Sequence, residues 1–199
     1  EYNKVDKAAY LVEQLANGKN IALVTDAGTP AISDPGEELV KQAYAAGIPV
    51  TSLPGACACV TALTLSGLST RRFAFEAFLP SDKKLRRKIL DSLCTETRTV
   101  IIYEAPHHLR ATLQELFAAL GDRRLTICRE LTKIHESAMQ FTLSEAIYYY
   151  EQNAPKGEYV LVIEGRNMAD LEQESRDAWA QLSVDEPVSY THLRAHETC

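Results

Sequence analysis

Small and conformationally special residues gather at 24–36, VTDAGTPAISDPG, directly after the apolar run 21–24. Gly28 permits a positive φ, and Pro30 fixes φ and removes a backbone donor. A loop of this composition lets the backbone approach a ligand closely. An ordinary connection from a strand to a helix, with Asp34 as the N-cap of the helix, would have the same composition. The loop alone therefore does not decide between a binding role and a structural one.

Basic residues gather at 81–88, SDKKLRRK, which contains five basic side chains and one Asp. Such a run can contact the phosphates of a nucleic acid. It can also form the solvated face of a helix, which is the usual role of a charge run. The chain has a formal net charge of −6, so any binding of nucleic acid has to use a local patch of this kind.

The five cysteines contain no C-x-x-C pair, and the spacing of Cys57 and Cys59 does not suit a zinc knuckle. Most of them stand in apolar runs, so we interpret them as core residues in a reducing compartment. His192 and His196 are spaced like a metal pair but lack an acidic third ligand, so we expect no metal. Without a signal peptide or an apolar run of about 18 residues, we expect a cytoplasmic protein with no membrane contact.

Helices and strands alternate in the first third of the chain. The spacing of apolar residues predicts helices over 4–17 and 36–46, and short apolar runs predict strands at 20–25 and 49–52. Residues 56–67 are apolar all round, which predicts a helix buried between layers. Alternation with short connections is typical of an α/β sheet.

The composition changes near Ser69, where we place a domain boundary. Beyond it the expected strands are 73–78, 97–105, 123–131 and 157–165, and the expected helices are 83–94, 107–121, 143–153 and 168–182. The sequence thus predicts α/β domains at 1–69 and 70–166, a C-terminal helix at 167–186 and a non-native tail at 187–199.

Six segments carry a family resemblance when they are taken in order: DAGTPAISDPG, LPGACACVTALTLSGL, FAFEAFLP, IIYEAPHHL, RELTK and GEYVLVIEG. Over residues 1–165 the chain closely resembles the small-subunit ribosomal RNA 2′-O-methyltransferase I family, in the tetrapyrrole-methylase superfamily of S-adenosylmethionine enzymes. The resemblance implies two α/β domains of the tetrapyrrole-methylase type, with the cofactor in the cleft between them. Members of the family begin with a strand, a P-x-G-N-L turn and an acidic segment. None of these is in this sequence, so we expect a fragment whose first domain is truncated.

The resemblance also implies an activity, which is methylation of a cytidine 2′-hydroxyl in the decoding region of 16S rRNA with S-adenosylmethionine as the methyl donor. The implied partners are 16S rRNA or the small ribosomal subunit, and a second copy of the chain in a homodimer. Two alternatives stay open. One is a methylase of a porphyrin-like small molecule on the same fold, and the other is an inactive truncated fragment.

The resemblance implies site residues at matching positions. The expected cofactor contacts are Asp26, Ala27, Gly28, Thr29, Ile32, Pro54, Gly55, Ala56 and Gly157. The expected substrate contacts are Tyr103, His107 and Arg129 at strand ends, and Lys83, Lys84, Arg86 and Arg87 from the basic run at 81–88. Glu104 and Glu130 are candidates for the base that takes the proton or for orienting the sugar, and the sequence does not choose between them. Arg129 can either hold a phosphate or pair with Glu130.

Overall fold

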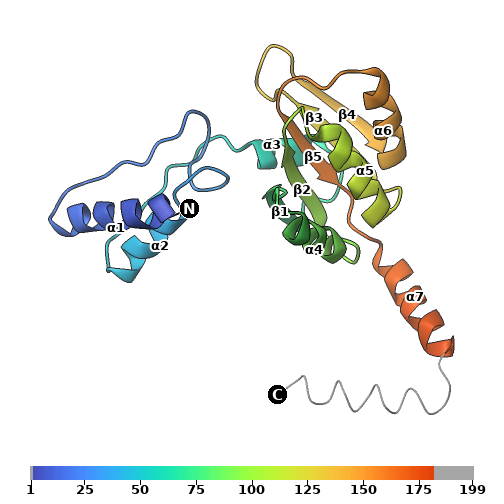
Figure 1. Cartoon of the computed structure of the whole chain (residues 1–199), viewed down its shortest axis with the longest axis horizontal. Coiled ribbons are helices and arrows are strands. Elements are labelled where there is room, and N and C mark those ends of the chain that lie inside the picture. The colour runs from blue at the N-terminus through green and yellow to red at the C-terminus, as the bar shows by residue number, and fades with distance from the viewer. Residues whose placement is uncertain (1, 182–199) are drawn as a thin grey trace.

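The computed structural model describes residues 2–181, in which some helices cover one mixed sheet of five strands and others extend away from it (Figure 1). The strands are β1 (Phe73–Phe78), β2 (Thr99–Glu104), β3 (Arg124–Arg129), β4 (Ser137–Thr142) and β5 (Tyr159–Ile163). The helices are α1 (Tyr2–Ala16), α2 (Glu37–Ala45), α3 (Ala58–Leu65), α4 (Lys83–Leu93), α5 (Leu109–Leu120), α6 (Leu143–Gln152) and α7 (Met168–Gln181). From residue 73 onward the predicted elements are confirmed, with shifted ends, and only β4 was missed.

The strand order of the sheet is β1-β2-β5-β3-β4. β1 is parallel to β2, whereas β5 is antiparallel to both of its neighbours and β4 is antiparallel to β3. The carboxyl ends of β1, β2 and β3 therefore meet the amino ends of β4 and β5 at one edge. The register places four paired residues in a row across this edge, and paired residues share a face of the sheet. The row is Glu104, Tyr159, Arg129 and Ser137.

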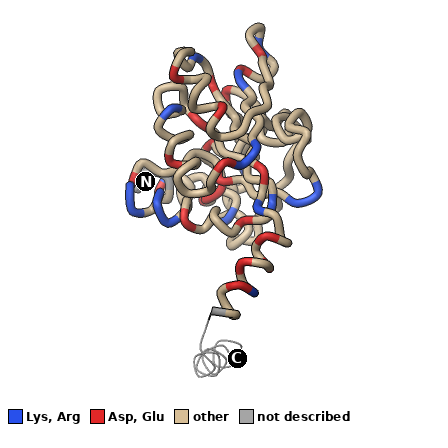
Figure 2. The backbone as a smooth tube through the Cα atoms, turned by 90° about the vertical axis from the view of Figure 1, so that its right-hand side faces the viewer, with Lys and Arg blue, Asp and Glu red and all other residues tan. Residues whose placement is uncertain are grey.

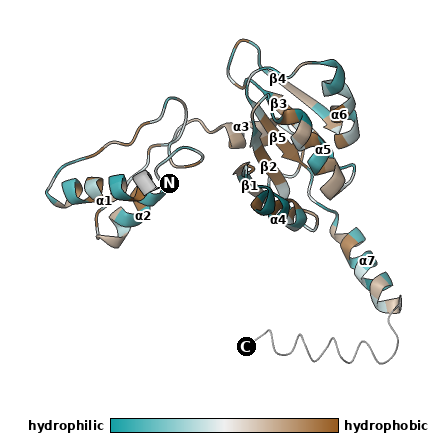
Figure 3. Ribbon diagram, viewed as in Figure 1, coloured by the Kyte–Doolittle hydropathy of each residue, from teal (hydrophilic) through white to brown (hydrophobic). Residues whose placement is uncertain are grey.

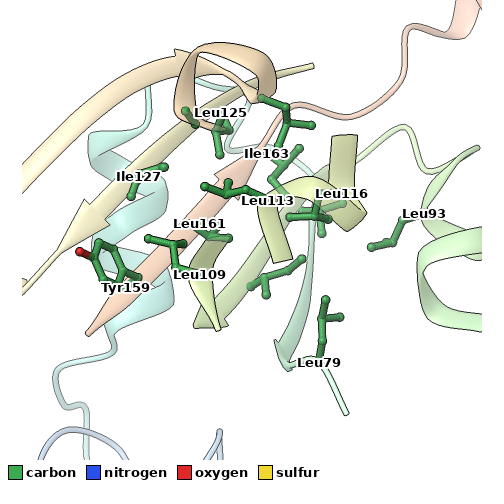
Figure 4. Packing of buried hydrophobic residues seen from close by; sticks show 14 of the residues in the cluster. Leu79, Leu93, Leu109, Leu113, Leu116, Leu125, Ile127, Tyr159, Leu161 and Ile163 are labelled. Atoms are coloured by element: carbon green, nitrogen blue, oxygen red, sulfur yellow. The ribbon is translucent and has the colours of Figure 1, made fainter. Parts of the chain in front are cut away.

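Helices α4, α5 and α6 cover the face of the sheet that carries this row. The larger hydrophobic core lies between these helices and the sheet (Figure 4). Leu109, Leu113 and Leu116 form the expected apolar stripe of α5 and are fully buried against Ile127 and Leu161. Each such side chain contributes about 1.5–3 kcal/mol when it is fully buried. Figure 3 shows the same concentration of apolar residues along β2 and β5.

The opposite face of the sheet is covered by α3. Cys59, Ala62 and Leu63 of this helix are buried against a second cluster that includes Ile101 and Val162. The prediction of a helix buried on all sides was wrong, because Val60 and Leu65 on its other side are 48 % and 44 % exposed. Within residues 2–181, α3 is thus packed on one layer rather than between two.

The strands predicted at 20–25 and 49–52 are not formed. Both segments are irregular, and Leu23 and Val24 of the first segment are exposed. An extended segment becomes a strand only when a neighbour takes up its backbone hydrogen bonds, and no strand among the described residues lies beside either segment. Helices α1 and α2 instead pack on each other, apart from the sheet (Figure 1).

The segment between α3 and β1 is tied to the sheet by side chains. Thr126 and Gln140 donate hydrogen bonds to the Ser66 carbonyl oxygen, at 2.8 and 3.1 Å, and Thr99 donates to the Ser69 carbonyl oxygen at 2.7 Å. The domain boundary at Ser69 stays a prediction, and so do the other domain limits. The predicted tail at 187–199 and the predicted helical residues 182–186 lie outside the described part.

Two further findings concern the helices. The Asp34 N-cap was wrong, because α2 begins at Glu37 after Gly36 and has no side-chain cap. No helix within residues 2–181 combines the length and the apolar composition needed to cross a membrane.

Candidate functional site

The two small-residue loops predicted to bind the cofactor contact each other. The backbone N–H and the hydroxyl of Thr29 both donate to the carbonyl oxygen of Ala56, at 2.9 and 3.1 Å. Gly28 has φ +77°, and a Cβ on it would lie only 2.9 Å from that oxygen. A Cβ on Gly55 would lie 3.0 Å from the Thr29 hydroxyl. Gly28 therefore serves the contact between the loops, which the sequence could not show.

The surface around this contact is open and made of small groups. The exposed predicted cofactor residues are Asp26, Ala27, Gly28, Ile32, Pro54, Gly55 and Ala56. Backbone groups without large side chains over them suit a ligand that combines an amino-acid group with a nucleoside. The residues present thus fit S-adenosylmethionine chemically, and their contacts with it stay predictions.

Tyr103 connects the second of these loops to the sheet. Its hydroxyl accepts a hydrogen bond from the backbone N–H of Cys59 at 2.9 Å, and its ring packs edge-on against Phe75 and Phe78. Burial raises the pKa of the Tyr103 hydroxyl, which keeps it neutral. Burial also raises the pKa of the Cys59 thiol to about 11, and its Sγ lies 3.3 Å from that of Cys57. Both groups thus stay protonated and act as packing and hydrogen-bonding groups.

Glu104 lies on the other face of the sheet and is only 5 % exposed. Its two carboxylate oxygens accept hydrogen bonds from the Ala105 N–H at 2.8 Å and from the Thr112 hydroxyl at 2.5 Å. The guanidinium of Arg86 donates in turn to Thr112 at 2.7 Å and to Glu115 at 2.6 Å. This network connects β2 to α4 and α5, so Glu104 has a structural role there.

Arg86 is thereby removed from the predicted basic patch. It stands three and four residues before Ile89 and Leu90, so it shares their packed face of α4, and this helical spacing could have revealed its position. Lys83, Lys84 and Arg87 are exposed, and Arg87 lies 3.8 Å from Asp91. Figure 2 shows positive and negative residues interspersed along the chain.

Glu130 is held in a tight turn between β3 and β4. Its backbone has φ +50°, and its Oε1 accepts hydrogen bonds from the Glu158 N–H at 2.8 Å and from Lys133 at 3.1 Å. These partners, the Glu158 N–H first, lower the pKa of the Glu130 carboxyl, which makes it a weak base. Gly157 has φ +82°, and a Cβ there would lie 2.6 Å from the Glu130 side chain. Gly157 thus makes room for Glu130 in this structure.

The last predicted substrate residues are Arg129 and His107. Arg129 forms no ion pair at contact distance within residues 2–181, so it does not pair directly with Glu130, although its charge helps to lower the pKa of that carboxyl. It lines a pocket of about 290 Å³ that also includes Tyr150, Lys156 and Tyr159, which the sequence reasoning missed. The His107 ring is exposed and lies against His108, with ring centroids 4.1 Å apart.

The chain matches the family model "Tetrapyrrole (Corrin/Porphyrin) Methylases" over residues 1–147. A protein of Synechocystis sp. named ribosomal RNA small subunit methyltransferase I is 50 % identical over 171 residues, which are 85 % of this chain and 61 % of that protein. A protein of the same name from Escherichia coli O157:H7 is 41 % identical over 99 % of this chain and 71 % of that protein. The chain spans about three fifths of the length of the first of these curated relatives.

Solved structures agree on the fold. The methyltransferase CobJ superposes with a TM-score of 0.60 at 20 % identity, covering 83 % of this chain and 74 % of CobJ. Uroporphyrin-III C-methyltransferase of Thermus thermophilus, complexed with S-adenosyl homocysteine, superposes with a TM-score of 0.53 at 16 % identity. The match covers 80 % of this chain and 73 % of that protein. The chain therefore belongs to the tetrapyrrole methylase family and, within it, to the ribosomal RNA small subunit methyltransferase I proteins.

Proposed function

We propose that this chain contributes the loops and the sheet of a methyltransferase that uses S-adenosylmethionine to methylate a cytidine 2′-hydroxyl in the decoding region of 16S rRNA. The observation that carries the proposal is the contact of Thr29 with Ala56, which holds two exposed small-residue loops together. Relatives named for ribosomal RNA methylation at 41–50 % identity support the RNA substrate over the porphyrin-like alternative.

In this proposal the cofactor lies on the surface formed by residues 26–32 and 54–56. When bound, S-adenosylmethionine supplies a strongly activated methyl group. Thr29, Gly55 and Ala56 fix the shape of the surface, and the exposed backbone groups around them bind the polar parts of the ligand. Tyr103 keeps this surface at the edge of the sheet through Cys59.

The protein residues then have to position the ribose and accept one proton. A 2′-hydroxyl is a poor nucleophile, so most of the catalytic effect comes from orientation, and a weak acceptor is sufficient. Both hydrogen bonds to the Glu130 carboxylate use Oε1, and none to Oε2 is formed within residues 2–181. Glu104 uses both of its oxygens internally. These contacts favour Glu130 over Glu104 as the group that meets the substrate.

Methyl transfer tests the proposal directly. Protein containing this chain is incubated with methyl-labelled S-adenosylmethionine and small ribosomal subunits that lack the modification, and the RNA is digested and analysed by mass spectrometry. We expect label on a 2′-O-methylcytidine and none on a porphyrin-like substrate. Label on a base, or on the porphyrin-like substrate alone, would contradict the proposal. Light scattering of the protein without ribosomal subunits tests the proposed homodimer.

A further inference from the structure

Three buried polar side-chain atoms in the described part of the chain have no hydrogen-bond partner: Arg129 Nε, Ser137 Oγ and the Tyr150 hydroxyl. They belong to one region. Arg129 and Ser137 are directly paired across β3 and β4, and Arg129 and Tyr150 line the same pocket. Buried polar groups in folded proteins nearly always have partners, so unpartnered ones that gather in one region make that region a candidate for binding a polar ligand.

The pocket lies between the end of β3, α6 and the connection that leads to β5; it is open to solvent and has a volume of about 290 Å³. This is about ten times the volume that one water molecule occupies in the liquid. Arg129 and Lys156 line it, and no carboxylate does. Glu104 shares the face but lies beyond β5, and its oxygens are bound to Ala105 and Thr112. A pocket with two cations in a chain of net charge −6 favours an anion.

The donors in the pocket match a tetrahedral oxyanion. The planar guanidinium of Arg129 can bind two oxygens of a phosphate at once. Burial raises the pKa of the Tyr150 hydroxyl, so that group keeps its proton and can donate. The Tyr159 hydroxyl accepts from the Lys156 N–H at 2.9 Å and also interacts with the Tyr150 hydroxyl. Asn153, Ala154 and Lys156 are exposed at the rim, so the pocket can be reached from solvent.

We propose that this pocket is a phosphate-binding site with Arg129 as its central contact. Resting on the proposed function, the phosphate belongs to the RNA backbone near the methylated nucleotide. Arg129 directly precedes Glu130, and both stand at the sheet edge at which Tyr103 holds the cofactor loops. An RNA strand that crosses this edge can contact the pocket on one face and the loops on the other.

The first test uses inorganic phosphate, with the Nε–Hε signal of Arg129 followed by nuclear magnetic resonance. We expect a saturable shift of this signal, and Arg129→Gln should weaken phosphate binding by at least about tenfold. Tyr150→Phe removes only a hydroxyl and should weaken binding about threefold. Arg124→Gln is the matched control, because Arg124 is on the same strand but is exposed and pairs with Glu164. An unmoved Arg129 signal, or equal binding by Arg129→Gln and Arg124→Gln, overturns the site.

The second test uses a short RNA with the decoding-region sequence and measures its affinity against salt. Losing one phosphate contact in Arg129→Gln should reduce the salt slope by about 0.7–0.9, and Arg124→Gln should leave it unchanged. If the pocket binds phosphate but Arg129→Gln leaves the salt slope unchanged, the pocket binds free phosphate, and the proposal that it binds the RNA backbone is overturned. Affinity for S-adenosylmethionine, measured on the same variants, should not change. A failure of the phosphate site can therefore be distinguished from a failure of the proposed function.

Discussion

The hydroxyl of Tyr103 accepts a hydrogen bond from the backbone N–H of Cys59 at 2.9 Å, which joins the end of β2 to the first turn of α3. The residues before this turn, 54–56, in turn hold Thr29. Three segments that are far apart in the sequence are thus connected in series. The position of the cofactor loops therefore depends on a side chain of the sheet.

Tyr103→Phe removes the acceptor of this bond. We expect the free energy of unfolding to fall by about 1–3 kcal/mol, because the N–H of the buried Cys59 is left without a partner. Affinity for S-adenosylmethionine should fall as well, since residues 54–56 lose their anchor. Urea unfolding and calorimetry measure the two effects. Tyr148→Phe is the control, because Tyr148 is 66 % exposed, and equal behaviour of the two variants would show that the bond is dispensable.

Gly28→Ala places a Cβ 2.9 Å from the Ala56 oxygen at a residue with φ +77°. Gly47→Ala is a matched control, because Gly47 has φ +70° and nothing within 4 Å of the added atom. Both variants carry the strain of a left-handed alanine, about 1–2 kcal/mol, but only the first disturbs the contact between the loops. We expect calorimetry to show weaker cofactor binding for Gly28→Ala alone. An equal loss of cofactor affinity in both variants would show that the contact between the loops is not part of the cofactor site.

Replacing Lys83 and Lys84 with Ala should weaken RNA binding and reduce its salt slope by up to about 0.7–0.9 for each lost phosphate contact, with no loss of stability. Arg86→Ala should instead lower the stability and leave the salt slope unchanged, because its guanidinium donates to the buried Thr112 hydroxyl and to Glu115. Filter binding over a salt series and thermal unfolding separate the two outcomes. An unchanged slope in the double variant would leave this run as a solvated helix face.

Acid stability should depend on Glu96. Hydrogen bonds from the Arg98 side chain lower the pKa of the Glu96 carboxyl from 4.5 to about 2. A carboxyl whose pKa is lower in the folded state stabilises the protein above its unfolded pKa, and this contribution is lost as the pH falls from about 4.5 to about 2. We expect the free energy of unfolding of Glu96→Gln to change less over this range than that of the wild type. Glu172→Gln, at an exposed position of α7, should follow the wild-type curve.

Local pattern was enough to predict most of the sheet. The apolar runs of β2 and β5 and the apolar stripe of α5 are buried as expected. Their hydrophobic pattern was sufficient to predict which side chains face the core. β4 was missed, although Met139 and Phe141 alternate with polar or small neighbours, because the segment is short and follows a turn. The family resemblance added the fold type, which pattern alone could not supply.

The predictions that were wrong concern features that depend on residues far away in the sequence. The apolar run at 20–25 looks like a strand in any local window, but strand formation is decided by a neighbour that the described residues do not provide. Gly157 was interpreted as making room for a ligand, and the atoms nearest to it belong to Glu130, 27 positions earlier in the chain. The unpaired state of Arg129 is likewise a property of its surroundings that its position in the sequence does not carry.

The strand order has a consequence for synthesis. β5, at residues 159–163, is the last strand to be made, yet it lies in the middle of the sheet between β2 and β3. Until β5 leaves the ribosome, no strand joins the β1–β2 pair to the β3–β4 pair. The edge of β2 that will pair with β5 stays unpaired while about 60 further residues are synthesised. At 5–20 residues per second this delay lasts roughly 3–12 s, long enough for a chaperone to bind the nascent chain. A stop codon between residues 143 and 158 would therefore release a chain with two strand pairs, β1 with β2 and β3 with β4, that no strand joins into one sheet.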